Sequence, residues 1–252
     1  MKKLSRLGVS FWALLTSVLV TRPALALETV HLVSFDEAPL VTFGPGQPGG
    51  VLVHAVKTMF EKAGIHYDLK LLPPKRALLT AATEPNTCVF PIERSQEREA
   101  RYRWISPISI SRIGAYAPPG QQRQLVTLED MRPFRLGTYL GSGIGEYLET
   151  FGMKVEYAAR NELNLGKLVH GRIDFWVSDT VSADWLAKRE GVRLGAPALV
   201  FFTSVRAMGC HPEFPESVRQ PLQRTLTQMY TTGEMQRLYQ AWFESQGKEQ
   251  TP

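Results

Sequence analysis

The sequence predicts an α/β fold, because segments with a strand pattern alternate with segments of helical spacing along most of the chain. Clusters of glycine and proline separate these segments, as they do in turns and loops. Strands that alternate with helices favour mostly parallel sheets. With 252 residues, 44% of them hydrophobic, the chain can bury one large core or two smaller ones.

The first half of the chain predicts a strand, a loop and a helix, followed by a second strand, helix and strand. The loop after the first strand contains Asp36, Glu37 and Pro39, and a glycine- and proline-rich turn at 44–50 precedes the first helix. The expected elements are a strand at 29–34, a helix at 51–63, a strand at 67–72, a helix at 73–82 and a strand at 88–91.

The second half continues the alternation and ends in two helices. Gly141-Ser142-Gly143 predicts a tight loop between a strand and a helix, and Gly233 interrupts the last helical region. The expected elements are extended segments at 107–117 and 200–208, strands at 134–138, 155–157 and 173–177, and helices at 144–150, before 170, at 216–231 and at 234–245.

The N-terminus has the pattern of a secretory signal peptide. Three basic residues precede an apolar run at 7–20, and a small-residue motif ends at Ala26. We therefore expect residues 1–26 to be a signal peptide that is cleaved after Ala26, and the mature protein to be periplasmic. A retained membrane anchor is the alternative, but the apolar run is too short to span a bilayer comfortably.

Removing the expected signal peptide changes the charge of the protein. The whole chain has 29 Lys and Arg residues against 24 Asp and Glu residues, a net charge of +5. Residues 1–26 hold four of the basic residues and none of the acidic ones, so the mature chain has a net charge of +1. A nearly neutral chain offers little support for nucleic-acid binding, and we expect no nucleic-acid partner.

Two charged residues are candidates for binding a zwitterion. An α-amino acid carries a carboxylate and an ammonium on one carbon, so a site that captures it needs a fixed cation and a fixed anion. Arg98 and Asp179 could supply them. Two alternatives stay open: Arg98 lies in a charged segment typical of a solvated surface, and Asp179 could simply cap the helix that follows it.

The order of the motifs resembles that of the bacterial extracellular solute-binding proteins of family 3, the periplasmic receptors of polar amino-acid ABC transporters. The shared features are a signal peptide, a proline-containing first loop, Gly-Gly before a helix, Ser95-Gln96-Glu97-Arg98, an aromatic-x-x-Pro motif, the Gly141-Ser142 loop, Gly171-Arg172-Ile173-Asp174 and a final helix pair interrupted at Gly-Glu. The resemblance covers essentially the whole mature chain.

The resemblance implies a two-lobed, periplasmic-binding-protein-like (type II) fold with two hinge crossings. Lobe 1 would comprise residues 27–112 and 201–252, and lobe 2 residues 113–200. The ligand would be trapped between the lobes by hinge closure.

The resemblance also implies roles for individual residues. Arg98 matches the arginine that clamps the ligand α-carboxylate, and Ser142 and Gly143 match the loop whose N–H groups meet the same carboxylate. Asp179 matches the aspartate that accepts the ligand ammonium. No metal or cofactor is expected, since the histidines show no metal-ligand spacing and the glycine loops match no nucleotide-binding motif.

The chain departs from the family at two places. Asp36-Glu37-Ala38-Pro39 lacks the aromatic residue common before the proline. Where lobe 1 usually offers small hydroxyl residues to the ammonium, this chain has Phe90, Pro91 and Glu93. The extra carboxylates, Glu37 and Glu93, could favour a cationic ligand such as a basic amino acid or a polyamine-like molecule. Exposed loop acids are the alternative.

Two cysteines in an oxidising compartment favour a disulfide. In the sheet of the family, the strands that carry Cys88 and Cys210 are antiparallel neighbours, so the resemblance implies that these two residues can pair. Two buried thiols are the alternative.

We therefore expect a monomeric, non-enzymatic binding protein that delivers a small amino-acid-like solute to an ABC transporter permease. One alternative is an enzyme resembling cyclohexadienyl dehydratase on the same scaffold, with Glu37 or Glu93 as its general acid. Another is a soluble component that presents a ligand to a membrane receptor.

Overall fold

The computed structural model describes residues 29–43, 47–121 and 123–249, so the signal peptide expected at 1–26 lies outside the described residues. Eight strands form one sheet: β1 (Val30–Ser34), β4 (Tyr67–Leu71), β5 (Thr87–Glu93), β6 (Arg103–Tyr116), β7 (Arg135–Tyr139), β8 (Lys154–Ala158), β9 (Phe175–Asp179) and β10 (Leu199–Cys210). A short ribbon pairs β2 (Thr42–Phe43) with β3 (Pro48–Gly49).

Helices separate most of the strands, as the sequence predicts. The α-helices are α1 (Val51–Ala63), α2 (Pro74–Thr83), α3 (Gly143–Thr150), α4 (Leu163–Val169), α5 (Thr180–Arg189), α6 (Glu216–Thr231) and α7 (Glu234–Glu249). Two 3₁₀ helices, η1 (Gln96–Arg101) and η2 (Leu128–Met131), form where the sequence indicated no element. Among the described residues, no helix combines the length and apolarity that a membrane span requires.

The strand order of the large sheet is β4-β1-β5-β10-β6-β9-β7-β8. The outer pairs are parallel, whereas β10 runs antiparallel to β5 and β6, and β6 runs antiparallel to β9. The expectation of mostly parallel sheets is therefore wrong at the centre. The cause is that β6 leads the chain out of one half of the molecule and β10 brings it back, so the two must run in opposite directions.

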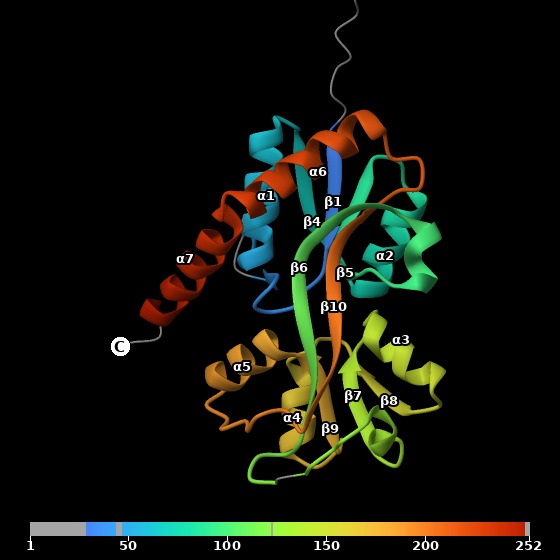
Figure 1. Cartoon of the computed structure of the whole chain (residues 1–252), viewed down its shortest axis with the longest axis vertical. Coiled ribbons are helices and arrows are strands. Elements are labelled where there is room, and N and C mark those ends of the chain that lie inside the picture. Colours follow the sequence, from blue (N-terminus) through green and yellow to red (C-terminus); the bar gives the residue numbers. More distant parts are fainter. Residues whose placement is uncertain (1–28, 44–46, 122, 250–252) are drawn as a thin grey trace, which may run out of the picture.

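Figure 1 shows that β6 and β10 connect two groups of elements, which we call lobe 1 and lobe 2. Lobe 1 contains β1, β4, β5, α1, α2, α6 and α7, and lobe 2 contains β7, β8, β9, α3, α4 and α5. The expected lobe boundaries at 112–113 and 200–201 fall within β6 and β10. Both connections are thus continuous strands, which limits the ways in which the lobes can move relative to one another.

Each lobe has its own apolar core on both sides of its sheet. In lobe 1, helix α1 buries one face, including Met59 and Phe60, against the sheet and against α6. The helix ends at Gly64, whose φ of 66° is a left-handed conformation that glycine adopts without strain. In lobe 2, Trp176 and Leu186 belong to a cluster that also includes Ala38 of the loop after β1. The first loop of lobe 1 therefore packs against lobe 2.

A disulfide joins two strands of lobe 1. Cys88 in β5 and Cys210 in β10 face each other in the antiparallel register, with a Cα–Cα distance of 3.9 Å and bonded sulfurs. This is the pair implied by the family resemblance. The bond ties β10, the strand that re-enters lobe 1, to its neighbour β5.

We predict that the disulfide contributes substantially to stability. It closes a loop between positions 122 residues apart, which on the chain-entropy model corresponds to roughly 3 to 5 kcal/mol. Reduction, or a Cys88→Ser/Cys210→Ser double substitution, should lower the free energy of unfolding measured in urea by about that amount. A thiol assay of unreduced protein in denaturant should find no free thiol, and two reactive thiols would contradict this prediction.

Candidate functional site

Strands of both lobes end at the boundary between the lobes. In lobe 1, Glu37 follows β1 and Glu93 is the last residue of β5. In lobe 2, the 141–143 loop follows β7, and Asp179 is the last residue of β9. The carboxyl ends of strands in open α/β sheets are where such folds bind ligands. This arrangement places five of the six predicted ligand-binding residues at the boundary between the lobes: Glu37, Glu93, Ser142, Gly143 and Asp179.

Arg98 is buried although it lies in a strongly charged segment. Helix η1 turns its side chain inward, so that only 5% of the residue is exposed. Its Nη2 donates to the Gly141 carbonyl at 3.1 Å and to Glu146 Oε2 at 2.8 Å. The solvated-surface alternative for Arg98 is therefore wrong. In this structure Arg98 connects lobe 1 to the loop and first turn of α3 in lobe 2.

Glu93 lies between two guanidinium groups and the start of α3. Its Oε2 accepts a hydrogen bond from the Gly143 N–H at 3.2 Å and lies 3.8 Å from Arg98 Nη1. Its Oε1 lies 3.2 Å from Arg206 Nη1. A side chain on Gly143 would begin 3.2 Å from the Cβ of Glu93, so glycine allows this close approach. A carboxylate thus occupies the place beside Arg98 and the α3 N-terminus, and it belongs to the protein.

Glu37 forms the most deeply buried ion pair in the described part of the chain. Its Oε1 lies 2.6 Å from Arg206 Nη2, and both residues are 1% exposed. The same oxygen accepts a hydrogen bond from the Tyr139 hydroxyl at 2.8 Å. Because Tyr139 belongs to lobe 2, this hydrogen bond crosses the boundary between the lobes. The alternative that Glu37 and Glu93 are exposed loop acids is wrong.

Ser142 differs from its expected role. Its N–H donates to the Tyr139 carbonyl at 3.1 Å, and its hydroxyl caps α3 by accepting from the Gly145 N–H at 3.3 Å. The start of α3 therefore presents the Gly143 N–H, and not that of Ser142, to a carboxylate. The cause is the tight turn after β7, because the hydrogen bond from the Ser142 N–H to the Tyr139 carbonyl closes that turn.

Asp179 caps α5 and keeps one oxygen free. Its Oδ1 accepts from the N–H groups of Val181 and Ser182 at 3.0 and 2.9 Å. Its Oδ2 is buried and has no hydrogen-bond partner, and the residue is only 4% exposed. The helix-cap interpretation is therefore correct for one oxygen. The other oxygen is a buried acceptor that lacks a donor, which is costly unless a ligand supplies one.

Polar side chains line one face of the hinge strands. Residues directly opposite each other in antiparallel strands project from the same face of the sheet, and residues two apart on a strand share a face. Ser109 lies opposite Arg206, and Ile113 lies opposite Asp179. With Ser111 between Ser109 and Ile113, this register places Asp179 and Arg206 on one face, along a stripe of buried hydroxyl groups.

Burial and the neighbouring charges shift the pKa values of the ionisable groups in the site. Burial raises the pKa of Glu37 to about 7, although the neighbouring Arg206 opposes this effect. Burial would also raise the pKa of Glu93, but Arg206, Arg98 and the Gly143 N–H together lower it. Burial would lower the pKa of Arg206, but Glu37 and Glu93 raise it well above its ordinary value. Glu93 is therefore the stronger acid of the two carboxyl groups, and Glu37 is the one that more readily takes up a proton.

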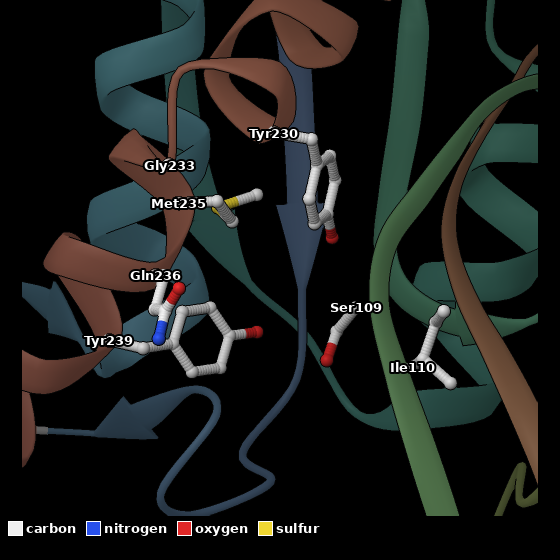
Figure 2. Close-up of a pocket in the computed structure, with 7 residues that line it drawn as sticks. All are labelled: Ser109, Ile110, Tyr230, Gly233, Met235, Gln236 and Tyr239. Atoms are coloured by element: carbon white, nitrogen blue, oxygen red, sulfur yellow. The ribbon is translucent and has the colours of Figure 1, made fainter.

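A cavity adjoins the polar stripe on the lobe 1 side. Figure 2 shows the hydroxyl groups of Ser109, Tyr230 and Tyr239 directed toward a common space between β6 and the α6–α7 junction. The cavity has a volume of about 390 Å³, within the range of small-molecule sites. Burial raises the pKa of Tyr239, and with smaller effects Asp179 raises it and Arg206 lowers it, so the cavity lies within electrostatic reach of the interlobe charges.

The sequence interpretation missed Arg206 and Tyr139. Arg206 is a charged residue within an otherwise apolar extended segment, and Tyr139 ends the strand before the 141–143 loop. The position of Arg206 could have indicated a buried ion pair, because an arginine buried within a strand needs carboxylate partners. Among the described residues, no group of three or more His, Cys, Asp or Glu side chains is arranged to hold a metal ion.

We predict that Glu37 makes folding stability fall as the pH rises from about 4.5 to about 7. Its pKa is 4.5 in the unfolded chain and about 7 in the folded protein, so only the unfolded chain has released the proton within this window. The loss should be roughly 2 to 3 kcal/mol. Urea denaturation across the window should show this slope in the unaltered protein and a flatter one in Glu37→Gln. Parallel curves would show that Glu37 does not titrate in this way.

Comparisons with known proteins support the fold. No family model matches the sequence. By sequence the chain is similar to the L-cystine-binding protein TcyJ of Escherichia coli K12, with 24% identity over 203 residues, which cover 79% of this chain and 75% of that protein.

Three solved structures illustrate the structural similarity. A histidine kinase sensor domain with similarity to periplasmic binding proteins has a TM-score of 0.77 at 16% identity, covering 85% of this chain and 96% of its own. The arginine-, lysine-, histidine-binding protein ArtJ of Geobacillus stearothermophilus has a TM-score of 0.74 at 16% identity, and the match covers 86% of this chain and 96% of ArtJ. The ancestral amino acid-binding protein AncCDT-1, a precursor of cyclohexadienyl dehydratase, has a TM-score of 0.72 at 18% identity, covering 85% and 95%.

The chain thus has the two-lobed α/β fold of the periplasmic binding proteins, and by sequence it is weakly similar to a cystine-binding protein.

Proposed function

We propose that the protein is a solute-binding protein that encloses a small amino-acid-like ligand between its two lobes. The observation that carries this proposal is the buried interlobe site, where charged side chains from both lobes converge and Asp179 keeps an unpartnered carboxylate oxygen. The known activities of similar proteins support it, since TcyJ is named for binding cystine and ArtJ for binding basic amino acids.

The two ends of the site suit opposite charges. Arg98 and the Gly143 N–H form a cradle for a carboxylate, and the positive end of the α3 dipole favours an anion there. Asp179 Oδ2 suits an ammonium group, which would supply the missing hydrogen-bond donor. In this structure Glu93 occupies the cradle, so the site orients a ligand through its ammonium group and leaves the remainder of the ligand to the cavity beside β6.

Ligand capture would depend on movement of the lobes about β6 and β10. Contacts between the lobes already involve Arg98 with Glu146, Glu37 with Tyr139, and a tilted ring contact between Trp242 and Trp185. A ligand that adds contacts to both lobes would shift the molecule further toward this closed arrangement.

We further propose that the protein is exported to the periplasm by its signal peptide, acts as a monomer and delivers its ligand to an ABC transporter permease.

An enzyme resembling cyclohexadienyl dehydratase is the less favoured function. One observation speaks for it, because a buried Glu37 with a pKa of about 7 could donate a proton at neutral pH. However, both oxygens of Glu37 face Arg206, and one also accepts a hydrogen bond from Tyr139. This carboxyl group is engaged within the protein, and the similar proteins named for an activity are binding proteins.

We predict that Asp179→Asn weakens ligand binding without unfolding the protein. Asparagine caps helices about as well as aspartate, so α5 should persist, but the ligand ammonium loses its anionic partner. Affinity for the best ligand of an amino-acid and amine panel should fall by roughly 2 kcal/mol in calorimetric titration. Asp184→Asn is the control, because Asp184 is an exposed residue of the same helix. Equal affinities in the two variants would mean that Asp179 is only a cap.

Measurements of ligand-induced compaction and of the fate of the ligand separate a receptor from an enzyme. A receptor needs complementarity to the ligand itself, whereas an enzyme must bind the transition state more tightly. Small-angle scattering should show a smaller radius of gyration with ligand than without, and chromatography should recover the ligand unchanged after long incubation. Recovery of a decarboxylated or dehydrated product, with turnover abolished in Glu37→Gln, would establish the enzyme instead.

A further inference from the structure

The carboxylate cradle of the site is already filled. Glu93 is 5% exposed and its carboxylate contacts the Gly143 N–H, Arg98 and Arg206. Arg98 also pairs with Glu146, and Arg206 also pairs with Glu37. Each guanidinium therefore faces two carboxylates of the protein. A ligand carboxylate that entered this region would lie beside these acidic groups and would have to displace Glu93.

The buried charges leave a place for a cation. Three nearly inaccessible acids, Glu37, Glu93 and Asp179, lie in the region of two equally inaccessible bases, Arg98 and Arg206. In the described part of the chain Asp179 has no ion pair, and its Oδ2 has no hydrogen-bond donor. Arg98 Nη1 and Arg206 Nε also lack hydrogen-bond partners, but their guanidinium groups are already neutralised by carboxylates. The unmet requirement is for a positive charge at Asp179.

The adjoining cavity suits the body of such a cation. None of its seven lining residues is charged, and Tyr230 and Tyr239 present aromatic rings and hydroxyl groups to it, as Figure 2 shows. Aromatic rings attract organic cations, and an uncharged lining does not repel an alkyl or aryl chain. The shared face of Ser109 and Arg206 places this cavity beside the polar stripe that leads to Asp179.

We propose that the ligand is an organic amine that lacks an α-carboxylate, and that Glu93 supplies from the protein the carboxylate that an amino acid would bring. The ammonium binds Asp179 Oδ2, and the alkyl or aryl chain of the amine occupies the cavity beside β6. This inference rests on the proposed function and names its ligand class. It makes Glu93 a specificity-determining residue, because its carboxylate excludes that of an amino acid from the cradle.

Matched pairs of compounds that differ only by the α-carboxylate test this proposal. The pairs are cadaverine with L-lysine, agmatine with L-arginine, and tyramine with L-tyrosine, titrated into the intact mature protein by calorimetry. In at least one pair the amine should bind 10-fold or more tightly than the amino acid. In Glu93→Gln and Glu93→Ser the ratio should shift at least 10-fold toward the amino acid, whereas Glu84→Gln, an exposed lobe 1 residue, should leave it unchanged.

The outcomes distinguish the failure of this inference from that of the proposed function. Tighter binding of the amino acids to the unaltered protein would overturn the inference and leave the solute-binding function standing. A ratio that does not change in Glu93→Gln, whose side chain keeps the size of glutamate, would overturn the role of Glu93. Binding of no compound from any pair would overturn both. Thermal unfolding of each variant identifies a substitution that prevents folding. If Glu93→Ser does not fold, the isosteric Glu93→Gln still gives the ratio of amine to amino-acid affinity that tests the role of Glu93.

Discussion

The arrangement of the two lobes depends on a buried cluster of charges. The Glu37–Arg206 pair is 1% exposed on both sides, and removal of such groups from water costs several kcal/mol for each ion unless every charge has close partners. Glu93 and Arg98 supply further partners from lobe 1, and Tyr139 and the Gly143 N–H supply donors from lobe 2. The carboxylates of the cluster have all these hydrogen-bond donors only when the lobes are in contact, so pairing of the buried charges favours the closed arrangement of the lobes.

The topology explains how so many charges meet. In each lobe, parallel strands direct their carboxyl ends toward the other lobe, and the antiparallel pair β6 and β10 passes between them. Arg206 lies on β10 where that strand enters lobe 1, four residues before the disulfide that fixes it to β5. The covalent bond and the ion pair therefore hold the same segment in register. A shift of β10 by one residue would turn Arg206 away from Glu37.

Much of the fold and part of the site could be predicted from the sequence. Local patterns indicated nearly every helix and strand, the order of motifs pointed to Arg98, and Glu37 and Glu93 stood out as departures from the family. The burial of Arg98 could not be predicted, because it depends on a 3₁₀ turn that competes with an equally plausible solvated loop. The Glu37–Arg206 pair joins residues 169 positions apart, so it depends on the register of the hinge strands. The turn that uses the Ser142 N–H is likewise a product of local geometry rather than composition.

In this structure a carboxylate of the protein, that of Glu93, occupies the cradle formed by Arg98 and the start of α3. The most direct test is a crystal structure of the mature protein with the tightest-binding compound from the matched pairs. We expect the Glu93 carboxylate to stay between Arg98 and the Gly143 N–H while an ammonium group lies within hydrogen-bond distance of Asp179 Oδ2. A ligand carboxylate on Arg98, with Glu93 turned out of the cradle, would contradict it.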